Sequence, residues 1–529
     1  MTGGWLNTVE RVGNRLPDPS TLFALGTVVV MLLSQIAVWL GWSVSRTLER
    51  DGKLVTEPIT PVSLLDADGL WWLISNLVKN FVEFPPLGLV LVGLLGIGVA
   101  ERSGLLPVLL RRLLAAAPGR LLVPMTVFVG ILSSLALDAG YVVLPPLAGA
   151  LFLAAGRSPL AGIAAVTAGV TCGFSANLFL TGLDPLLAGL STAAAHLLDP
   201  DYEVAISANW WFMIVSTLLL TAAGAFVTRR FVEPRLPRPT AAEMAAETPP
   251  AAAGSMAVSE ARAGVAPEVS AAADAVQDEG RGLRFAGWTF AALLALLLAA
   301  VLIPGAPLAG EGARFPRWME ALVPILLIVF LGTGLAYGIG AGSIRRDRDA
   351  VDMMGETMRT MGPYLVLAFF AAQFIACFGH SRLGEMLAVV GGGWLAQLAL
   401  DPAALMLAFI AVVMAGNLLI GSASAKYAFF APVFVPMFMQ AGIAPELTQA
   451  AYRVGDSVTN GITPFNPYLV IILAFIRRYR PDAGLGTLVA LMLPYTLVFA
   501  PIWAALLGLW VVAGWPLGPG GGLVYPPGG

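Results

Sequence analysis

The chain has 529 residues, of which 58% are hydrophobic and 12% charged, and its mean hydropathy is +0.81. Soluble globular domains carry about 25% charged residues, so this composition excludes a soluble fold and indicates a polytopic protein of the lipid bilayer. The net charge of −3 gives no basic surplus for nucleic-acid binding. Two cysteines and two histidines supply neither a disulfide framework nor a zinc motif, so we expect no metal site.

Nine uncharged apolar runs are candidates to cross the membrane, because about 20 residues of helix span its hydrocarbon core. No small-residue cleavage site precedes the first run, which we therefore expect to be a retained helix and not a signal peptide. In chain order the runs are 21–45, 84–100, 121–137, 210–228, 285–308, 321–343, 363–379, 402–425 and 483–515.

Arginine clusters in short loops predict the orientation, because such loops are retained in the cytoplasm. The clusters follow the second, fourth and sixth runs and precede the last. They are Arg111, Arg112 and Arg120; Arg229, Arg230, Arg235 and Arg238; Arg345, Arg346 and Arg348; and Arg477, Arg478 and Arg480. We expect an integral protein of the bacterial cytoplasmic (inner) membrane with its N-terminus inside.

A stretch of different composition divides the chain into two membrane halves, 1–230 and 284–529. Between Phe231 and Phe285 there is no aromatic residue, and Ala, Pro, Glu, Ser and Thr dominate. Such a composition cannot bury a core. We predict that 231–283 is a disordered cytoplasmic linker.

The two halves contain an internal repeat at an offset of 286 residues. Ten positions between 138 and 169 are identical to their counterparts in the second half without a gap. Shared Tyr, Pro and Gly residues make composition an insufficient explanation. The identities include Tyr141 with Tyr427, Pro146 with Pro432, Gly156 with Gly442, Pro159 with Pro445 and Gly169 with Gly455.

The predicted topology makes the two copies inverted relative to each other. Each copy would contain a span broken by polar residues, near 138–140 or 421–424, followed by a re-entrant hairpin near 160–190 or 446–476. The predicted fold is therefore an all-α membrane protein of about nine transmembrane helices and two re-entrant hairpins. Inverted repeats with broken helices are typical of secondary transporters, whose site lies near the midplane.

Three aspartates in apolar segments are candidates for ion coupling. An ionised group at membrane depth is energetically costly, so its presence there indicates a function. Asp184 either contacts substrate or a cation or caps a hairpin tip near the surface. Asp456 is three residues from Arg453, and the two either neutralise each other on one helix face or serve a ligand. Asp138 couples an ion or braces the break.

Amide and hydroxyl residues around the aspartates indicate a hydrated cavity, and we expect Asn177, Ser457 and Asn460 to line it. Lys426 and Tyr427 follow the second break. A tyrosine there can stack on a substrate ring while its hydroxyl stays hydrated, although a packing role is the alternative.

No enzyme motif of the G-x-S-x-G, H-E-x-x-H or phosphate-loop type occurs in the chain. An intramembrane aspartyl protease would require two aspartates such as Asp138 and Asp456 to meet, but it leaves the inverted repeat unexplained. Without a nucleotide-binding domain, an ion gradient or the substrate's own gradient must drive transport. We therefore expect no enzyme and no cofactor, with a proton or sodium as coupling ion.

The second-half block 415–460, with Gly421-Ser422-Ala-Ser424-Ala-Lys426-Tyr427 at its centre, closely resembles the p-aminobenzoyl-glutamate transporter (AbgT) family. So do 137–141 and 175–184 in the first half. The similarity covers the whole chain apart from the linker. A divalent-anion:sodium symporter, which also uses inverted repeats, is the alternative carrier.

The resemblance implies a homodimer that transports p-aminobenzoyl-glutamate or exports sulfonamide-type folate antimetabolites, energised by protons or sodium. The family's substrate-binding residues correspond to Asp184, Ser424, Tyr427, Pro445, Arg453, Asp456 and Pro464. The family usually has Trp at the position of Tyr427, and the smaller aromatic ring of tyrosine keeps stacking on an aryl substrate possible.

Overall fold

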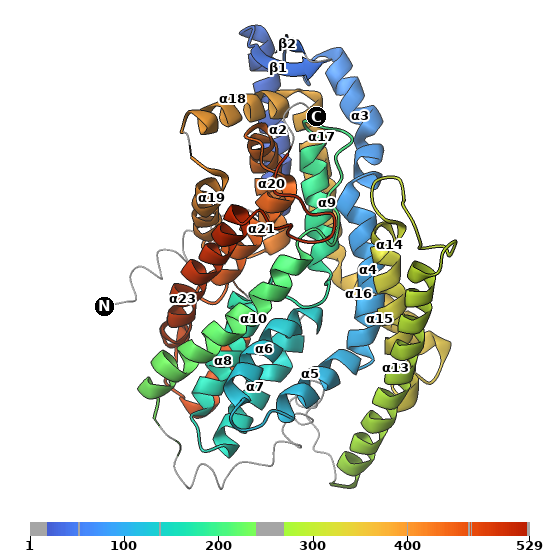
Figure 1. Ribbon diagram of the computed structural model, residues 1–529, viewed down its shortest axis with the longest axis vertical. Helices are drawn as coiled ribbons and strands as arrows, with labels where there is room; N and C mark the ends of the chain where they lie inside the picture. Colours follow the sequence, from blue (N-terminus) through green and yellow to red (C-terminus); the bar gives the residue numbers. More distant parts are fainter. Residues whose placement is uncertain are drawn as a thin grey trace.

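Helices form nearly all of the secondary structure in the computed structural model (Figure 1), which describes residues 18–50, 53–136, 139–237, 239, 269–398, 400–463, 466 and 468–525. Those of the first half are α2 (Pro19–Trp39), α3 (Ala67–Val82), α4 (Pro85–Arg102), α5 (Leu105–Ala115), α6 (Leu122–Leu132), α7 (Ala139–Ala154), α8 (Pro159–Cys172), α9 (Leu183–Ala195) and α10 (Trp210–Val227). Short turns are η1 (Ser133–Ala136), η2 (Thr228–Val232) and η3 (Glu233–Arg235).

The second half continues with helices of similar lengths. They are α13 (Val269–Leu302), α14 (Arg317–Glu320), α15 (Leu322–Ala341), α16 (Asp347–Thr360), α17 (Gly362–His380), α18 (Leu383–Gln397), α19 (Pro402–Asn417), α20 (Ala423–Gln440), α21 (Pro445–Val458), α22 (Leu469–Tyr479) and α23 (Leu485–Val512). Strands β1 (Val44–Arg50) and β2 (Lys53–Ile59) form an antiparallel hairpin that pairs Val44 with Ile59. The first predicted run, 21–45, therefore ends earlier as a helix, at Trp39.

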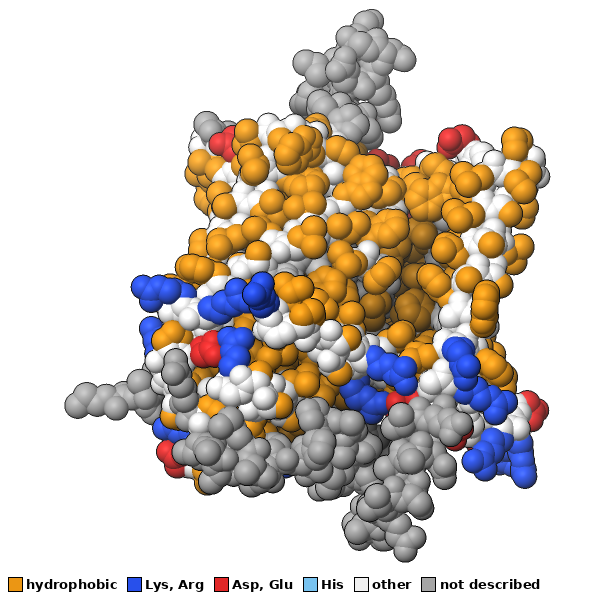
Figure 2. All heavy atoms as spheres, turned by 60° about the horizontal axis from the view of Figure 1, so that its bottom comes forward, with side chains coloured by type: hydrophobic (Ala, Val, Ile, Leu, Met, Phe, Trp, Pro, Cys, Tyr) orange, Lys and Arg blue, Asp and Glu red, His pale blue; other side chains and the backbone are white. Residues whose placement is uncertain are grey.

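Seven segments of the described chain are long and apolar enough to cross a membrane as single helices or helix pairs in line. They are Pro19–Trp39, Ala67–Arg102, Trp210–Arg235, Asp278–Leu302, Leu322–Ala341, Gly362–His380 and Leu485–Val512. Figure 2 shows hydrophobic side chains across one face and Lys and Arg side chains toward its lower border. This pattern is that of an integral membrane protein.

Two contacts identify which chain segments share one end of the bundle. The Arg229 guanidinium, just beyond α10, donates to the backbone carbonyl of Arg120, just before α6. Arg157, just before α8, forms a salt bridge with Glu233 of η3. We call this the basic end, and the end where α10 begins the opposite end.

The first re-entrant hairpin is formed by α6, η1 and α7 (hairpin 1), because its chain leaves and returns at the basic end. After Arg157 the chain crosses to the opposite end through two half-helices, α8 and α9 (broken crossing 1). Thr192 near the end of α9 accepts a hydrogen bond from the backbone N–H of Val204, and Leu197 lies against Gly379 at the end of α17.

The second hairpin is formed by α19 and α20 (hairpin 2) and enters from the opposite end. The end of α18, which leads into α19, lies against Gln440 at the end of α20 through Gly392. The chain then crosses through α21 and α22 (broken crossing 2), and Tyr479 at the end of α22 lies against Gly149 of hairpin 1. Counted over the described residues, the two broken crossings raise the seven apolar spans to nine.

The structure thus confirms a helical, inverted-repeat architecture with two hairpins, but it corrects where the hairpins lie. Residues 160–190 and 446–476, predicted to be re-entrant, belong to the broken crossings, and the predicted broken spans are the hairpins. A helix of 11 residues such as α6 is too short to span about 30 Å. Two half-length helices separated by polar residues look alike in sequence whether the chain continues or turns back.

The internal repeat is visible in the element boundaries. Helices α8 and α21 begin and end 286 residues apart, and so do the starts of α9 and α22. Gly156 and Gly442 both adopt positive φ, 67° and 79°, in the turn before these crossings. An added Cβ at Gly169 would meet Val127 and one at Gly455 would meet Val413, which are again 286 residues apart. Helix α8 therefore packs against α6 in the same way as α21 packs against α19.

The predicted disordered linker, 231–283, is helical where the structure describes its flanks. Turns η2 and η3 continue α10, and α13 already begins at Val269, with Arg111 of α5 bound to Glu279. Disorder is thus wrong for these flanks, because α13 extends beyond its apolar part with a charged first portion. The middle of the linker, 240–268, lies outside the described residues.

The C-terminal segment after α23 lies across the opposite end of the bundle. The backbone carbonyl of Leu517 accepts from the N–H of Phe212 in α10, and that of Leu523 accepts from Ala444 before α21. The N–H of Tyr525 donates to Gly442. This tail therefore joins the first and second halves.

Candidate functional site

A cavity of about 680 Å³ lies where the hairpin tips and the breaks of the crossings meet. Hairpin 2 contributes its tip, and hairpin 1 contributes Ser134 and Tyr141. The remaining walls come from both breaks, from α4 and from the starts of α2 and α17. The lining residues are Asp18, Pro19, Leu22, Val90, Leu94, Ser134, Tyr141, Phe174, Thr181, Gly182, Leu183, Leu186, Met361, Tyr364, Leu419–Ser424, Asn460, Asn466 and Tyr468.

Four half-helices begin at this cavity: α7, α9, α20 and α22. Residues in or next to their first turns line it, namely Tyr141, Leu183, Ser424 and Tyr468. The free N–H groups of a helix N-terminus carry a positive partial charge and favour anions. Among the described lining residues Asp18 is the one with a carboxylate, and none is Lys or Arg. The backbone thus provides a positive potential at these helix starts, whereas α8, α19 and α21 end next to the lining residues Phe174, Leu419 and Asn460 with the opposite sign.

A stacked tyrosine pair forms part of the cavity wall. The rings of Tyr141 and Tyr468 are 4.1 Å apart between centroids and nearly parallel, at 11°. Tyr141 belongs to hairpin 1 and Tyr468 to the break of crossing 2, so the pair links the two repeats. Aromatic faces of this kind offer an apolar surface to a planar ring.

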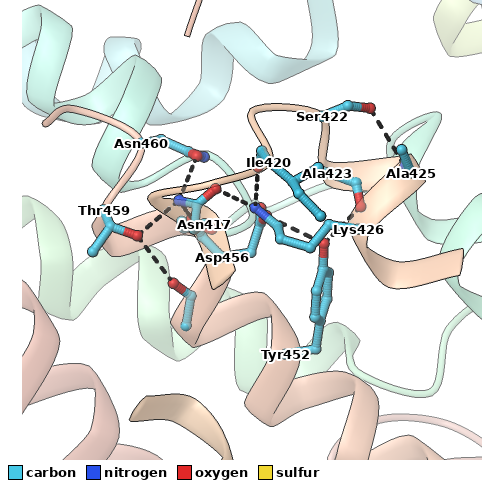
Figure 3. Close-up of polar contacts among 12 residues, drawn as sticks. Asn417, Ile420, Ser422, Ala423, Ala425, Lys426, Tyr452, Asp456, Thr459 and Asn460 are labelled. Carbon is cyan, nitrogen blue, oxygen red and sulfur yellow. Dashed lines mark hydrogen bonds and ion pairs between the residues drawn. The ribbon is translucent and has the colours of Figure 1, made fainter. Parts of the chain in front are cut away.

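A buried ion pair lies beside the tip of hairpin 2 (Figure 3). The Lys426 ammonium is 2.6 Å from Oδ1 of Asp456, and both side chains are buried. The ammonium also donates to Oδ1 of Asn417 and, at 3.3 Å, to the backbone carbonyl of Ile420. The Tyr452 hydroxyl lies 2.6 Å from the Ala423 carbonyl oxygen and 3.2 Å from Asp456 Oδ1. The Lys426–Asp456 ion pair therefore links hairpin 2 to crossing 2.

Asn417 extends this cluster toward the cavity. Its side-chain amide lies 2.6 Å from the carbonyl oxygen of Asp456, 2.7 Å from Thr459 Oγ1 and 2.9 Å from Asn460 Oδ1. Asn460 lines the cavity. Asn417 therefore connects the cavity-lining Asn460 to the Lys426–Asp456 ion pair.

A second buried ion pair connects Asp184 with Arg453, whose Nη2 lies 2.5 Å from Oδ1. The other carboxylate oxygen accepts from the backbone N–H and hydroxyl of Thr181, a lining residue. Asp184 is therefore buried in the helix start beside the cavity and is not a surface cap. Arg453 and Asp456 do not neutralise each other, because each has a different partner of opposite charge.

The structure brings most of the predicted residues near the cavity, although few of them line it. Ser424 and Asn460 line it as expected. Asn177 accepts from Ser134 of the lining, and Ser457 bonds to the carbonyl of Arg453 and the N–H of Ser175. Pro445 begins α21 at the opposite end. Asp138 and Pro464 lie outside the described residues.

Tyr427 is placed differently from the prediction that it stacks on a substrate. It is fully buried, its hydroxyl lies 2.6 Å from Ser191 Oγ, and its ring contacts that of Tyr452. Its repeat counterpart Tyr141 lines the cavity instead. Sequence reasoning missed Tyr141 as a site residue, although the 286-residue offset from Tyr427 pointed to it, and it also missed Tyr468, Thr181 and Asn417.

Inverted repeats whose hairpins and broken helices enclose a cavity define a membrane transporter. A family model described as the AbgT putative transporter family matches residues 4–525. The chain belongs to this AbgT family. It is 35% identical over 530 residues to the p-aminobenzoyl-glutamate transport protein of Escherichia coli K12, which covers 99% of this chain and 96% of that protein.

Two solved structures are similar over nearly the whole chain. The YdaH transporter of Alcanivorax borkumensis, described as having an unusual topology, has a TM-score of 0.84 at 45% identity and covers 95% of this chain and 100% of its own. MtrF of Neisseria gonorrhoeae, described as illuminating a class of antimetabolite efflux pumps, has a TM-score of 0.87 at 43% identity, covering 98% and 100%. These relatives are named as transporters, so the protein is not an enzyme, and the protease alternative is set aside.

Proposed function

We propose that the protein is an ion-gradient-driven secondary transporter, working as an antiporter, for p-aminobenzoyl-glutamate or related aryl compounds. Sulfonamide-type folate antimetabolites are candidate export substrates. The observation that carries this proposal is the cavity in which a stacked tyrosine pair meets four helix N-termini. The names of the relatives supply the substrate class.

The cavity matches the two chemical parts of such a substrate. The faces of Tyr141 and Tyr468 suit an aminobenzoyl or arylsulfonamide ring. Helix N-termini suit a carboxylate without requiring a lysine or arginine in the wall. Serine and asparagine side chains, such as Ser424 and Asn460, add hydrogen bonds. A small aryl carboxylate therefore fits the chemistry of both halves of the wall.

We propose Asp184 and Asp456 as the coupling residues. Asp138 is the candidate if Asp456 proves to be structural. Both described aspartates are buried in ion pairs next to lining residues, so a change in their charge acts directly on the hairpin tip and the helix start. The coupling ion is a proton or sodium. We further propose a homodimer in the bacterial inner membrane with the N-terminus and the basic end inside, following the arginine clusters and the family resemblance.

Reconstituted liposomes test the function. Radiolabelled p-aminobenzoyl-glutamate and a sulfonamide are offered separately while a proton or a sodium gradient is imposed. Accumulation of either aryl compound with one of these gradients is expected. Flux equal to that of protein-free liposomes for both compounds under both gradients contradicts the proposal.

The coupling role has its own control. Asp456→Asn keeps the size of the side chain and removes its charge, so we expect gradient-driven accumulation to be lost while counterflow of substrate persists. Asp482→Asn removes an exposed carboxylate in the loop before α23 and should transport normally. Unimpaired accumulation by Asp456→Asn would assign this residue to structure and move the coupling role to Asp138.

A further inference from the structure

The Lys426 ammonium occupies a site built from oxygen atoms. Its neighbours are a carboxylate oxygen of Asp456, the side-chain oxygen of Asn417 and the backbone carbonyl of Ile420. Uncharged backbone carbonyls and a carboxylate are also the ligands that small hard cations take in membrane carriers. The geometry around Nζ is therefore that of a cation site.

Two helix C-termini add to the negative potential at this point. Helix α19 ends at Asn417, with Ile420 in the turn that follows, and α21 ends two residues after Asp456. The last carbonyls of a helix carry a negative partial charge and favour cations. The ammonium contacts the turn after α19 through the Ile420 carbonyl and the last turn of α21 through the Asp456 side chain.

A second, independent feature is an unused ligand atom at this site. The other carboxylate oxygen of Asp456, Oδ2, is buried and has no hydrogen-bond partner among the described residues. A buried carboxylate oxygen left in this state is costly. It would gain a contact from any cation that replaced the ammonium.

Among the residues that the structure describes, the first repeat has no such site, although its backbone follows the same path. The positions equivalent to Lys426, Asp456 and Asn417 are Gly140, Val170 and Ile131. A Cβ at Gly140 would lie 2.2 Å from Ser133 Oγ, so a side chain does not fit there. The cation site is therefore a property of the second repeat alone.

We propose that the oxygen cage of Asn417, Ile420 and Asp456 is a monovalent-cation site whose resident cation is the chain's own Lys426. The other polar groups nearby already have partners, because the Arg453 guanidinium is bound to Asp184 and the neutral Tyr452 hydroxyl lies 3.2 Å from Asp456 Oδ1. The protein accordingly needs no sodium at this position to hold hairpin 2 against crossing 2. Removing the ammonium opens the cage to sodium.

The test is the sodium dependence of thermal stability in purified full-length protein, which requires no transport and no knowledge of the substrate. Its failure would leave the proposed transport function standing. Melting is followed in sodium chloride and in choline chloride of equal ionic strength. The variants are Lys426→Met, which removes the ammonium, and Lys426→Gln, which keeps hydrogen-bond donors. Lys79→Met, at an exposed lysine of α3, is the control.

We expect sodium to raise the melting temperature of both Lys426 variants by about 2 °C or more over choline, and to leave the wild type and Lys79→Met unchanged. Adding Asp456→Asn to Lys426→Met should abolish the response, because the carboxylate is the charged ligand. Equal behaviour of both Lys426 variants in the two salts, folded or unfolded, overturns the proposal. An equal sodium response in the wild type does so too.

Discussion

Arg453 on α21 donates to Asp184 on α9, with 2.5 Å between Nη2 and Oδ1, and both side chains are buried. The helix α9 belongs to the first repeat and α21 to the second. The pair therefore connects the two broken crossings beside the cavity. Each repeat supplies one of the two charges, because the equivalent positions, Val470 and Thr167, carry none.

Asp184→Asn should destabilise the protein strongly. It leaves the Arg453 guanidinium buried beside a neutral amide, and breaking a buried pair from one side costs about 3–5 kcal/mol. The melting temperature of the purified protein measures the loss.

The matched control for this pair is the double substitution of Asp184→Leu with Arg453→Met, which removes both charges and retains apolar volume. Such replacements are often neutral, so most of the stability should return. A single Asp184→Asn protein that melts with the wild type would show that the pair contributes no stability.

Tyr141 and Tyr427 should respond differently although the repeat relates them. Tyr141→Ala removes a ring from the cavity wall and is expected to weaken binding of an aryl substrate while the protein stays folded. Tyr427→Phe removes the hydrogen bond to Ser191 and should cost about 1 kcal/mol of stability with little effect on affinity. Equilibrium binding and thermal melting of both variants separate the two roles.

The opposite result is equally informative. Normal affinity in Tyr141→Ala together with lost affinity in Tyr427→Ala, which removes the ring, would return the substrate-stacking role to Tyr427. In that case hairpin 2 would have to expose a ring that is fully buried in this structure.

The hairpins should be accessible from opposite faces of the membrane. Cysteines placed at Leu121 and Ala155 flank hairpin 1, and those at Leu400 and Gln440 flank hairpin 2; all four positions are exposed. A membrane-impermeant maleimide should label the first two from one face and the last two from the other. Both native cysteines are buried and provide the background control. Labelling of Leu121→Cys and Ala155→Cys from different faces would contradict a re-entrant hairpin 1.

The two glycines at the helix crossings should not tolerate a methyl group. A Cβ at Gly169 would lie 2.4 Å from the carbonyl oxygen of Val127, and one at Gly455 would lie 2.7 Å from Val413 Cβ. We expect Gly169→Ala and Gly455→Ala each to cost about 1–3 kcal/mol through overpacking. Gly508→Ala in α23, where a Cβ meets nothing within 4 Å, should be neutral or stabilising. Similar melting of all three variants would argue against tight crossings.

Much of the architecture could be predicted from the sequence because it depends on local signals. Apolar runs indicated the membrane class, and the repeat paired Pro159 with Pro445, which begin equivalent helices in the structure. The placement of the hairpins could not be predicted, because a half-length helix carries no mark of whether the next one continues or returns. That information lies in contacts far apart in sequence, such as Arg157 with Glu233.

For the site, residue types could be predicted but partners could not. Asp184, Arg453 and Asp456 were identified because buried charge is costly. Their pairing was not visible, because spacing along one helix favoured Arg453 with Asp456, whereas the fold brings Asp184 and Lys426 from other helices. Which of the two repeat-related tyrosines faces the cavity depends on the rotation of its helix about its axis. Tyr141 faces the cavity, whereas Tyr427 faces Ser191.

The C-terminal tail limits how this carrier can open. Its bonds fasten the start of α10 to the joint between α20 and α21, through Leu517 to Phe212 and Leu523 to Ala444. Parts of both repeats therefore move as one rigid block at the opposite end as long as these bonds persist. Hairpin 2 is anchored there at its base, and its tip, at Leu419–Ser424, is held to crossing 2 through the Ala423 carbonyl and through Lys426. Opening the cavity at the tip would therefore require these contacts with crossing 2 to break while the contacts at the base of hairpin 2 persist.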